Sequence, residues 1–270
     1  IETGKLMKEF YLMNESKEIQ ETMAYCFGFS GYLQSIIELQ KNDKIKFCTY
    51  SNKKIAFTNV YYPPLKESKS VQKNTYSLYK NYIITGPNAS GKTTLLKTSF
   101  LNMLFSQQFG GGFYDSAIIV PQDYFYCYIN IPDTSGRDSL FQAEARRCKD
   151  ILDLINKKTT KKHFIIFDEL YSGTNPYEAS ASAYGYLKYL KQKTNVRFML
   201  TTHFIDLCKN LDKQTGITNK HMETKVIDNK LSYKYNIKSG ISNIKGGIQV
   251  LYDLDYPDYI TKEANTILNS

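Results

Sequence analysis

Residues 86–93, with an apolar segment before them and a helix-compatible segment after them, constrain this chain more than any other feature. They fit the pattern G-x-x-x-x-G-K-[ST] at every fixed position: Gly86, Pro87, Asn88, Ala89, Ser90, Gly91, Lys92 and Thr93. Such a loop wraps a phosphate with backbone N–H groups, and its glycines supply dihedral angles and clearance that a Cβ would obstruct. Residues 82–85 read as the preceding strand and residues 93–104 as the following helix, which is the context that the motif requires. The sequence therefore predicts a nucleotide site at the end of a strand.

Side chains at the end of this loop carry its predicted chemistry. Lys92 is expected to reach the β- and γ-phosphates, and Thr93 to supply a hydroxyl to Mg²⁺. The helix that follows presents its positive N-terminal end to the same phosphates, and we count Thr94 among the nucleotide-contacting residues. We therefore expect ATP and Mg²⁺ as cofactors.

A phosphate loop of this kind requires an acidic residue at the end of another buried strand. Residues 163–169, His-Phe-Ile-Ile-Phe-Asp-Glu, have that pattern. Asp168 is expected to hold the magnesium shell, and Glu169 to polarise the attacking water as a general base. A strand that ends in two solvated acids would explain the same residues without a function. The phosphate loop favours the functional interpretation.

A histidine follows the next apolar strand along the chain. Residues 196–200 are apolar apart from Arg197, and Thr201-Thr202-His203 come directly after them. Beside an Asp-Glu pair, a histidine in this place can contact the γ-phosphate or the attacking water. A single histidine is more often structural, but its position in this series favours a catalytic role. The predicted catalytic residues are Glu169, His203 and Lys92.

The first part of the chain has a helical pattern. Apolar residues recur every three or four positions between residues 6 and 40, and proline is absent there. Gly28 and Gly31 predict a break or kink inside this stretch. We therefore expect a helical segment over residues 1–44 and a separate domain over residues 45–270.

The second domain alternates strand-like and helix-like segments, with loops at residues 66–74 and 110–112. This alternation predicts an α/β fold with a mainly parallel sheet flanked by helices. Residues 225–237 differ, because two β-like runs surround Asp228-Asn229, which predicts a peripheral β-hairpin. The strand-like segments are residues 45–49, 54–57, 82–85, 117–120, 164–167 and 196–201, and the helix-like ones are residues 93–104, 137–157 and 177–191.

The composition is that of an ordinary globular protein, with 42% hydrophobic and 23% charged residues. No apolar run approaches the roughly 20 residues of a membrane-spanning helix, so we expect no membrane partner. The net charge of +9 suits an anionic partner such as nucleic acid, although dispersed lysines also keep proteins soluble. The sequence begins with Ile1, which we take to indicate a fragment of a longer protein.

The cysteines give no sign of a disulfide framework or a zinc site. They are odd in number and scattered, without a C-x-x-C pair. Free thiols in a reducing compartment are the favoured interpretation, and we expect an intracellular protein. The cysteines are Cys26, Cys48, Cys127, Cys148 and Cys208.

The motifs follow one another in the order of ABC-type ATPases: phosphate loop, Asp-Glu strand, then strand and histidine. Among these, the sequence most resembles the MutS family of mismatch-repair and related proteins. The ordered matches extend over residues 57–268. They are Ile84-Thr85-Gly86-Pro87-Asn88 with Gly91-Lys92-Thr93-Thr94, Ser139-Leu140-Phe141-Gln142-Ala143-Glu144, Asp168-Glu169-Leu170-Tyr171-Ser172-Gly173-Thr174-Asn175, Thr202-His203-Phe204, and Ser239-Gly240-Ile241-Ser242 with Gly246-Gly247-Ile248-Gln249-Val250.

The resemblance implies a P-loop NTPase of the ABC-ATPase type that hydrolyses ATP to ADP and phosphate. It implies a second MutS-like subunit, most simply another copy in a head-to-tail homodimer. Ser139 would then donate to the γ-phosphate held by the other subunit, in trans. Residues 1–44 would form the base of a lever arm. DNA would be bound mainly by domains outside this chain, in mismatch repair or recombination, and a MutL-like protein would be a further partner.

The sequence departs from the family pattern at several positions. Thr93 stands where family members usually carry serine, which keeps the metal-binding hydroxyl. Ser172 replaces an arginine that is common before Gly173-Thr174, so coupling at a dimer interface is in question. No aromatic residue near Val71 matches the family's adenine-stacking position, and the mismatch-reading Phe-x-Glu element is missing. Mismatch recognition therefore does not follow for this chain.

Other functions stay open at this stage. A transporter motor would show a glycine-rich signature after the serine, whereas Leu140 and Phe141 follow Ser139. An SMC-like protein would need long heptad arms. A nucleotide-dependent clamp with little turnover would bind ATP without a catalytic base, and Glu169 with His203 argues against it. A MutS relative in recombination or translation is equally compatible with the motifs.

Overall fold

The computed structural model describes residues 2–65, 71–129, 139–212, 215–227, 230–242, 244 and 246–269. The chain divides into two compact units, Ile1–Ile45 and Lys46–Ser270. Within the ranges described, no helix is both long and apolar enough to span a membrane.

The first unit consists of the helices α1 (Glu2–Glu15) and α2 (Lys17–Lys41), neither of which buries a side chain. The predicted break at Gly28–Gly31 is wrong, because α2 runs through both glycines. A glycine costs only about 1 kcal/mol inside a helix, which does not by itself end one. The interruption lies at Ser16, whose side chain accepts a hydrogen bond from the backbone N–H of Ile19 at 3.4 Å.

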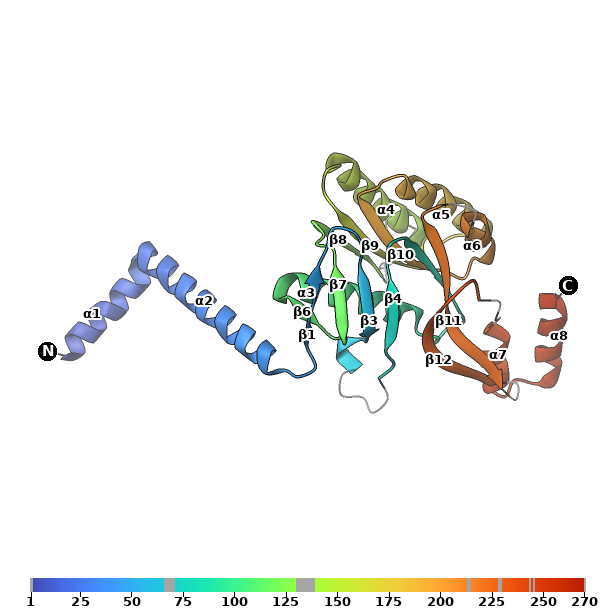
Figure 1. The fold of residues 1–270 in the computed structure, drawn as a ribbon, viewed down its shortest axis with the longest axis horizontal. Coiled ribbons are helices and arrows are strands. Elements are labelled where there is room, and N and C mark those ends of the chain that lie inside the picture. Colours follow the sequence, from blue (N-terminus) through green and yellow to red (C-terminus); the bar gives the residue numbers. More distant parts are fainter. Residues whose placement is uncertain are drawn as a thin grey trace. The chain divides into compact units, whose positions relative to one another are not determined.

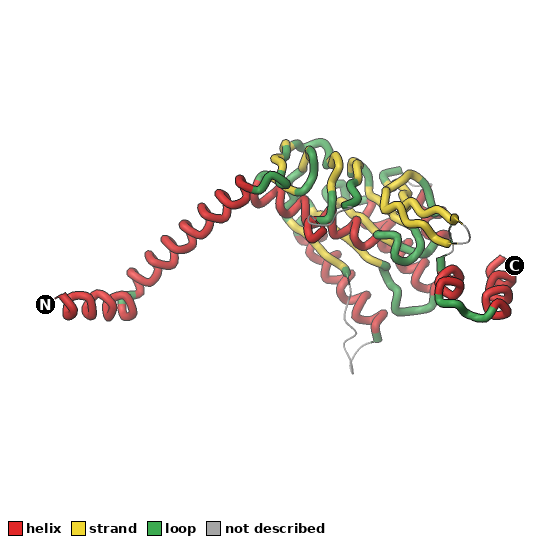
Figure 2. Tube along the Cα trace, turned by 90° about the horizontal axis from the view of Figure 1, so that it is seen from below, coloured by secondary structure: helices red, strands yellow, loops and turns green. Residues whose placement is uncertain are grey.

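The second unit is built on a six-stranded sheet in the order β12-β11-β5-β10-β9-β8 (Figure 1). The pairs from β11 to β8 are all parallel, so the predicted mainly parallel sheet is confirmed. β11 and β12 form the predicted hairpin at its edge (Figure 2), while Asp228 and Asn229 lie outside the described residues. The strands are β5 (Asn81–Thr85), β8 (Tyr124–Tyr128), β9 (His163–Asp168), β10 (Val196–Thr201), β11 (Ile217–Ile227) and β12 (Lys230–Ser239).

A smaller four-stranded sheet, in the order β2-β7-β3-β4, lies in the same unit. The predicted loop at residues 110–112 is only partly right. Gly110 ends a helix, but β6 (Gly111–Gly112) pairs antiparallel with β1 (Lys46–Phe47). The strands of the smaller sheet are β2 (Thr49–Tyr50), β3 (Ala56–Val60), β4 (Asn74–Ser77) and β7 (Ser116–Ile119), and a 3-10 turn, η1 (Pro63–Leu65), follows β3.

Helices flank the larger sheet, as predicted. The predicted helix over residues 137–157 begins at Leu140, and Arg137 lies outside the described residues. The short helices α6, α7 and α8 were not predicted. The helices of this unit are α3 (Lys92–Phe109), α4 (Leu140–Lys157), α5 (Pro176–Lys191), α6 (Ile205–Asp212), α7 (Gly247–Asp253) and α8 (Asp258–Asn269).

Strand β9, which lies between β10 and β8, shows why the sheet is buried on both faces. Its side chains alternate: Ile165 and Phe167 belong to one core cluster, with the buried faces of α4, α5 and α6. Phe164 and Ile166 belong to a second cluster, with α3 and the smaller sheet. A strand covered on both faces reads as a continuous apolar run, which is the pattern of residues 164–167. Because β5, β9 and β10 are parallel, their carboxyl ends lie together at one end of this core.

Candidate nucleotide site

The phosphate loop connects the end of β5 to the start of α3, which is the context that its sequence predicted. Gly91 has φ +92°, a left-handed conformation that residues with a Cβ rarely adopt. A Cβ at Gly91 would lie 3.1 Å from the ring of Tyr235, and one at Gly86 would lie 2.7 Å from Ser90 Oγ. Both positions thus require glycine for the loop to close around a small group.

The loop lines a cavity of about 380 Å³ that fits a nucleotide's phosphates. Residues 88–94, including Thr94, belong to its lining, as does Glu169. The hydroxyl oxygen of Ser90 is buried, and in the described structure it has no hydrogen-bond partner. Leaving such a group unsatisfied costs about 1–3 kcal/mol, so a ligand that bonds with it would be stabilised here.

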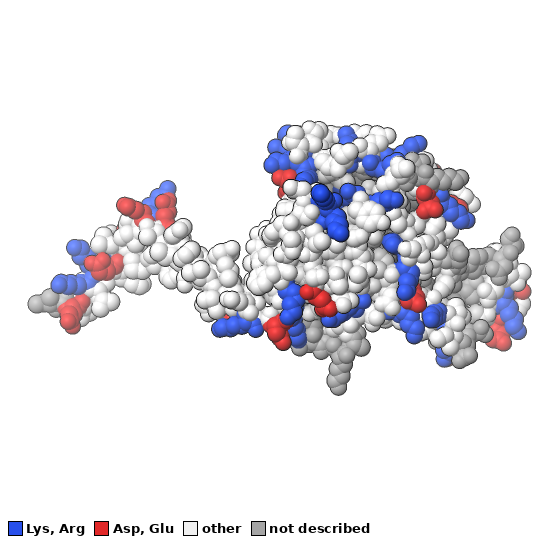
Figure 3. Space-filling view, viewed as in Figure 1, with Lys and Arg blue, Asp and Glu red and all other residues white. Residues whose placement is uncertain are grey.

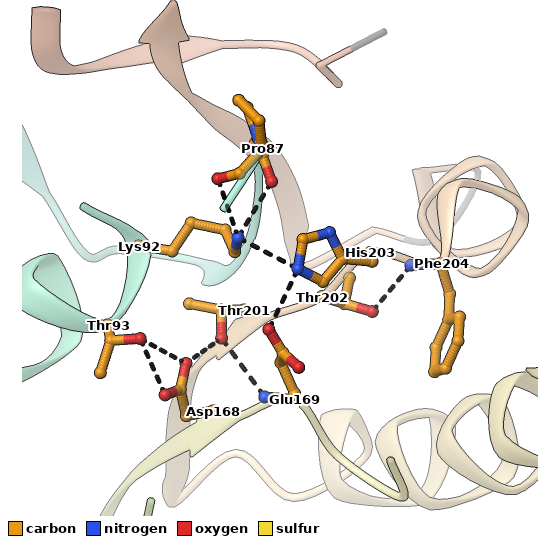
Figure 4. A network of polar contacts seen from close by, with 10 residues as sticks. Pro87, Lys92, Thr93, Asp168, Glu169, Thr201, Thr202, His203 and Phe204 are labelled. Carbon is orange, nitrogen blue, oxygen red and sulfur yellow. Dashed lines mark hydrogen bonds and ion pairs between the residues drawn. The ribbon is translucent and has the colours of Figure 1, made fainter. Parts of the chain in front are cut away.

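Lys92 lies folded against its own loop. Its Nζ donates to the carbonyl oxygens of Gly86 at 3.0 Å and Pro87 at 3.2 Å, and lies 3.2 Å from Nε2 of His203 (Figure 4). Burial lowers the pKa of Lys92, and the nearby carboxylates of Glu169 and Asp168 act in the opposite direction. The ammonium group is therefore placed where an anionic ligand would replace two carbonyl partners with stronger ones.

Thr93 and Asp168 lie together as a set of oxygen ligands. The Thr93 hydroxyl donates to both carboxylate oxygens of Asp168, at 3.1 and 2.8 Å, and the Thr201 hydroxyl donates to Oδ1 (Figure 4). The β9–β10 register pairs Thr201 with Asp168. Hydroxyl and carboxylate oxygens suit Mg²⁺, which binds proteins through few carboxylates together with phosphates and waters. The described residues contain no group of three or more His, Cys, Asp or Glu that could hold a metal ion.

Glu169 and His203 face each other across the ends of two strands. Glu169 Oε1 lies 3.0 Å from His203 Nε2, and both side chains are partly exposed. Glu169 has φ +54°, and its backbone N–H donates to the carbonyl oxygen of Thr201 at 3.1 Å. The hydrogen bond from His203 lowers the pKa of Glu169 despite the opposing effect of burial. Glu169 is therefore held as a carboxylate beside the phosphate loop.

The far wall of the cavity is apolar and was missed by sequence reasoning. Tyr62, Met222 and Tyr235 line it, from the loop after β3 and from the β11–β12 hairpin. Asn74 fixes Tyr235 in place: its amide donates to the Tyr235 carbonyl at 3.0 Å, and its Oδ1 accepts from the N–H of Ile237 at 2.7 Å. These three side chains give the cavity an apolar surface beside the phosphate loop.

Ser139 is not among the residues that line this cavity. It caps α4 from an exposed position: its Oγ accepts from the Gln142 N–H at 3.3 Å, and the Gln142 side chain accepts from the Ser139 N–H at 2.9 Å. Since Oγ accepts in this capping box, its hydroxyl proton is directed elsewhere.

Glu144, one turn further along α4, is a second residue that sequence reasoning did not single out. It is buried, and its carboxylate accepts hydrogen bonds from the Ser172 N–H at 3.1 Å, the Ser172 hydroxyl at 3.0 Å and the Gly173 N–H at 3.0 Å. These bonds join α4 to the loop that follows Asp168 and Glu169. The sequence signals were its place as the last residue of the Ser139–Glu144 match and an acid on the otherwise apolar side of a helix.

Fold and site define an α/β protein with a parallel-rich sheet. A phosphate-loop motif follows one of its strands, and an acidic residue ends another strand on the same side. Within that class, the family model for MutS domain V matches residues 82–270. The chain therefore belongs to the MutS family, through its domain V.

Individual relatives have the same family names. The chain is 31% identical over 191 residues to the DNA mismatch repair protein MutS of Bacteroides thetaiotaomicron, covering 69% of this chain and 22% of that protein. It is 28% identical over 228 residues to Endonuclease MutS2 of Alkaliphilus oremlandii, covering 81% of this chain and 27% of that protein. Against the MutS of Streptococcus equi subsp. equi, 27% identity extends over 92% of this chain and 30% of that protein. The chain thus spans less than a third of the length of these relatives.

Proposed function

We propose that this chain is the ATP-hydrolysing part of a MutS-like protein, with an ABC-type nucleotide site. The observation that carries the proposal is the convergence of Lys92, Thr93, Asp168, Glu169 and His203 on one side of the phosphate loop. Each of these side chains has a role that phosphoryl transfer requires, and the apolar wall with Tyr235 offers a surface for the base.

In this proposal the phosphates of ATP lie in the loop formed by residues 86–93. Lys92 turns from its loop carbonyls to the β- and γ-phosphates, and Ser90 donates its otherwise unpaired hydroxyl. Thr93 and Asp168 would hold Mg²⁺, which neutralises charge on the transferred group when bound. Glu169 accepts a proton from the attacking water, and His203 holds the Glu169 carboxylate in orientation and keeps it ionised.

The site is completed by a second copy. Ser139 lies outside the cavity of its own chain, exposed at the positive end of the 18-residue helix α4. In a head-to-tail dimer, this end of α4 would face the γ-phosphate held by the partner. Glu144 then has a positioning role, because it ties α4 to the loop after the catalytic carboxylate. ATP binding would hold the two subunits together, and hydrolysis would release them.

The relatives' names, DNA mismatch repair protein and endonuclease, support a role in DNA repair as part of the proposal, and recombination is the alternative that the motifs leave open. The test is steady-state ATP hydrolysis by the full-length protein, with and without homoduplex, mismatched and branched DNA. Turnover that changes with DNA supports the coupling, and the preferred DNA distinguishes repair from recombination. Turnover that no DNA alters would leave an ATPase and contradict the coupling to DNA.

A further inference from the structure

A second cavity, of about 300 Å³, lies at the amino ends of β9 and β10, whereas the nucleotide site lies at the carboxyl ends of the parallel strands. Its lining includes the residues that lead into β9 and β10, whereas the phosphate loop follows the carboxyl end of β5. None of the residues that line it is acidic, and all of them lie in the described part of the chain: Asn52, Lys53, Lys54, Ile55, Leu78, Val120, Gln122, Thr160, Lys162, Thr194, Asn195, Val196 and Arg197.

The cations of this cavity have no counter-charge in the described structure. Among the described residues, no ion pair and no hydrogen bond involves the side chain of Lys53, Lys54, Lys162 or Arg197. The nearby carboxylate of Asp123 is already engaged, by the Lys161 ammonium at 3.0 Å and by the Lys162 backbone N–H at 2.8 Å. The lining is therefore positively charged without local compensation.

Arg197 is the least ordinary of these groups. Alternation along β10 places its side chain on the face of Met199, toward the smaller sheet, where it is half-buried. Burial alone lowers the pKa of its guanidinium, with no carboxylate acting against it. A guanidinium stays charged in proteins, and a partly desolvated charge without a partner is costly. An anion in the cavity would remove that cost.

The surroundings add to the positive field. Lysines occupy four of the six positions from 157 to 162, at the end of α4 and in the loop that leads to β9. Lys and Arg side chains gather on this face of the second unit, below α4 and α5 and above β3 and β7 in the view of Figure 1 (Figure 3). Such a concave region of one sign of charge concentrates anions.

We propose that this cavity binds a phosphate group, held by the Arg197 guanidinium and by the ammonium groups of Lys53, Lys54 and Lys162. The planar fork of arginine matches two phosphate oxygens at once, and the lysines supply point charges around it. The phosphate belongs either to a phosphorylated small molecule or to a nucleic-acid backbone. The site is separate from ATP hydrolysis and does not depend on that proposal.

The test measures binding in a Lys92→Ala background of the full chain, so that the phosphate loop contributes little. One probe is inorganic phosphate, followed by NMR chemical-shift titration, and the other is a fluorescently labelled DNA duplex, followed by anisotropy over a salt series. Arg197→Gln is compared with Lys188→Gln, which removes one exposed charge from α5, away from the cavity. Arg197→Lys retains the charge without the fork and should recover part of the affinity.

The proposal predicts that Arg197→Gln weakens phosphate binding by about tenfold or more, while Lys188→Gln does not. If the ligand is a nucleic-acid backbone, duplex affinity also falls and its log–log salt slope decreases by about one. Loss of phosphate binding with unchanged duplex binding indicates a small phosphorylated molecule. Phosphate and duplex binding that are both indifferent to Arg197→Gln would overturn the site. If that variant fails to fold, the double variant Lys54→Gln with Lys162→Gln applies the same criteria.

Discussion

Nε2 of His203 lies 3.0 Å from Oε1 of Glu169, at the ends of two strands that are neighbours in the sheet. This hydrogen bond places the proposed base and the group that orients it beside Lys92. It also favours the ionised form of Glu169. The contact therefore links the geometry of the site to its protonation state.

The pKa of Glu169 should rise when His203 is replaced by alanine. The hydrogen bond from His203 is the largest cause that lowers this pKa, so its loss leaves burial, which raises the pKa, opposed by the charge of Lys92. Because the folded-state pKa is lowered, this contact contributes stability that is present above the ordinary glutamate pKa and is lost as pH falls through the folded value. A carboxyl carbon NMR titration of Glu169 measures the shift, with His221→Ala as the control. A Glu169 pKa that does not change in His203→Ala would contradict the assigned cause.

Two inactive variants should restore activity when mixed, if Ser139 acts in trans. Ser139→Arg blocks the contact that one subunit makes with the γ-phosphate in its partner's site. Lys92→Ala disables the nucleotide site of the subunit that carries the substitution. A mixed dimer then holds one competent site, so turnover should recover to a substantial fraction of the wild-type rate. ATP hydrolysis by the mixture is compared with each variant alone, with mixed dimers verified by mass spectrometry. Mixed dimers without recovered turnover would count against the head-to-tail arrangement.

Glu144→Gln should destabilise the protein by about 1–3 kcal/mol, because an amide cannot accept all three hydrogen bonds that reach the buried carboxylate. Asp150→Asn, an exposed change on the same helix, should stay within about 0.5 kcal/mol of the wild type. Urea unfolding measures both free energies. Equal stability of the two variants would show that Glu144 does not join α4 to the Ser172 loop.

Tyr235→Ala should weaken ATP binding by roughly tenfold while leaving inorganic triphosphate binding nearly unchanged. The tyrosine lines the apolar wall of the cavity, and stacking of a base on an aromatic ring is worth about 1–3 kcal/mol. Tyr177→Ala, at a highly exposed position on α5, is the matched control. Calorimetric titration with both ligands separates base from phosphate contacts. An equal loss for both ligands would instead place Tyr235 at the phosphates.

Local patterns in the sequence predicted much of the fold. The phosphate loop and the apolar runs at β9 and β10 are contiguous, so each could be recognised from its own residues. The alternation of strands and helices then predicted the parallel sheet, which the structure confirms. The kink at Gly28 was wrong because a glycine only weakens a helix, whereas the Ser16 side chain caps a new one.

Contacts between residues that are far apart in the chain could not be predicted from the sequence. Tyr235 reaches the cavity because its strand pairs with β11, and Asn74 bonds to that strand from 161 positions away. Glu144 accepts a hydrogen bond from Ser172, 28 positions away along the chain. The cavity that contains Arg197 is lined by residues from several distant segments, so the sequence alone does not show which cations lie together. Such contacts depend on strand order and register, which short-range periodicity does not encode. The roles of Ser139, Glu169 and His203 in catalysis stay predictions.

The measurement that tests the central claim most directly is steady-state ATP hydrolysis by the full chain with Mg²⁺, wild type against Glu169→Gln. The account predicts Mg²⁺-dependent turnover in the wild type and a loss of about 100-fold or more in the variant, with ATP binding retained. Glu21→Gln, an exposed change in α2, should hydrolyse ATP as the wild type does. Near-normal turnover in Glu169→Gln would remove Glu169 as the base, and no Mg²⁺-dependent turnover in the wild type would contradict the proposed function itself.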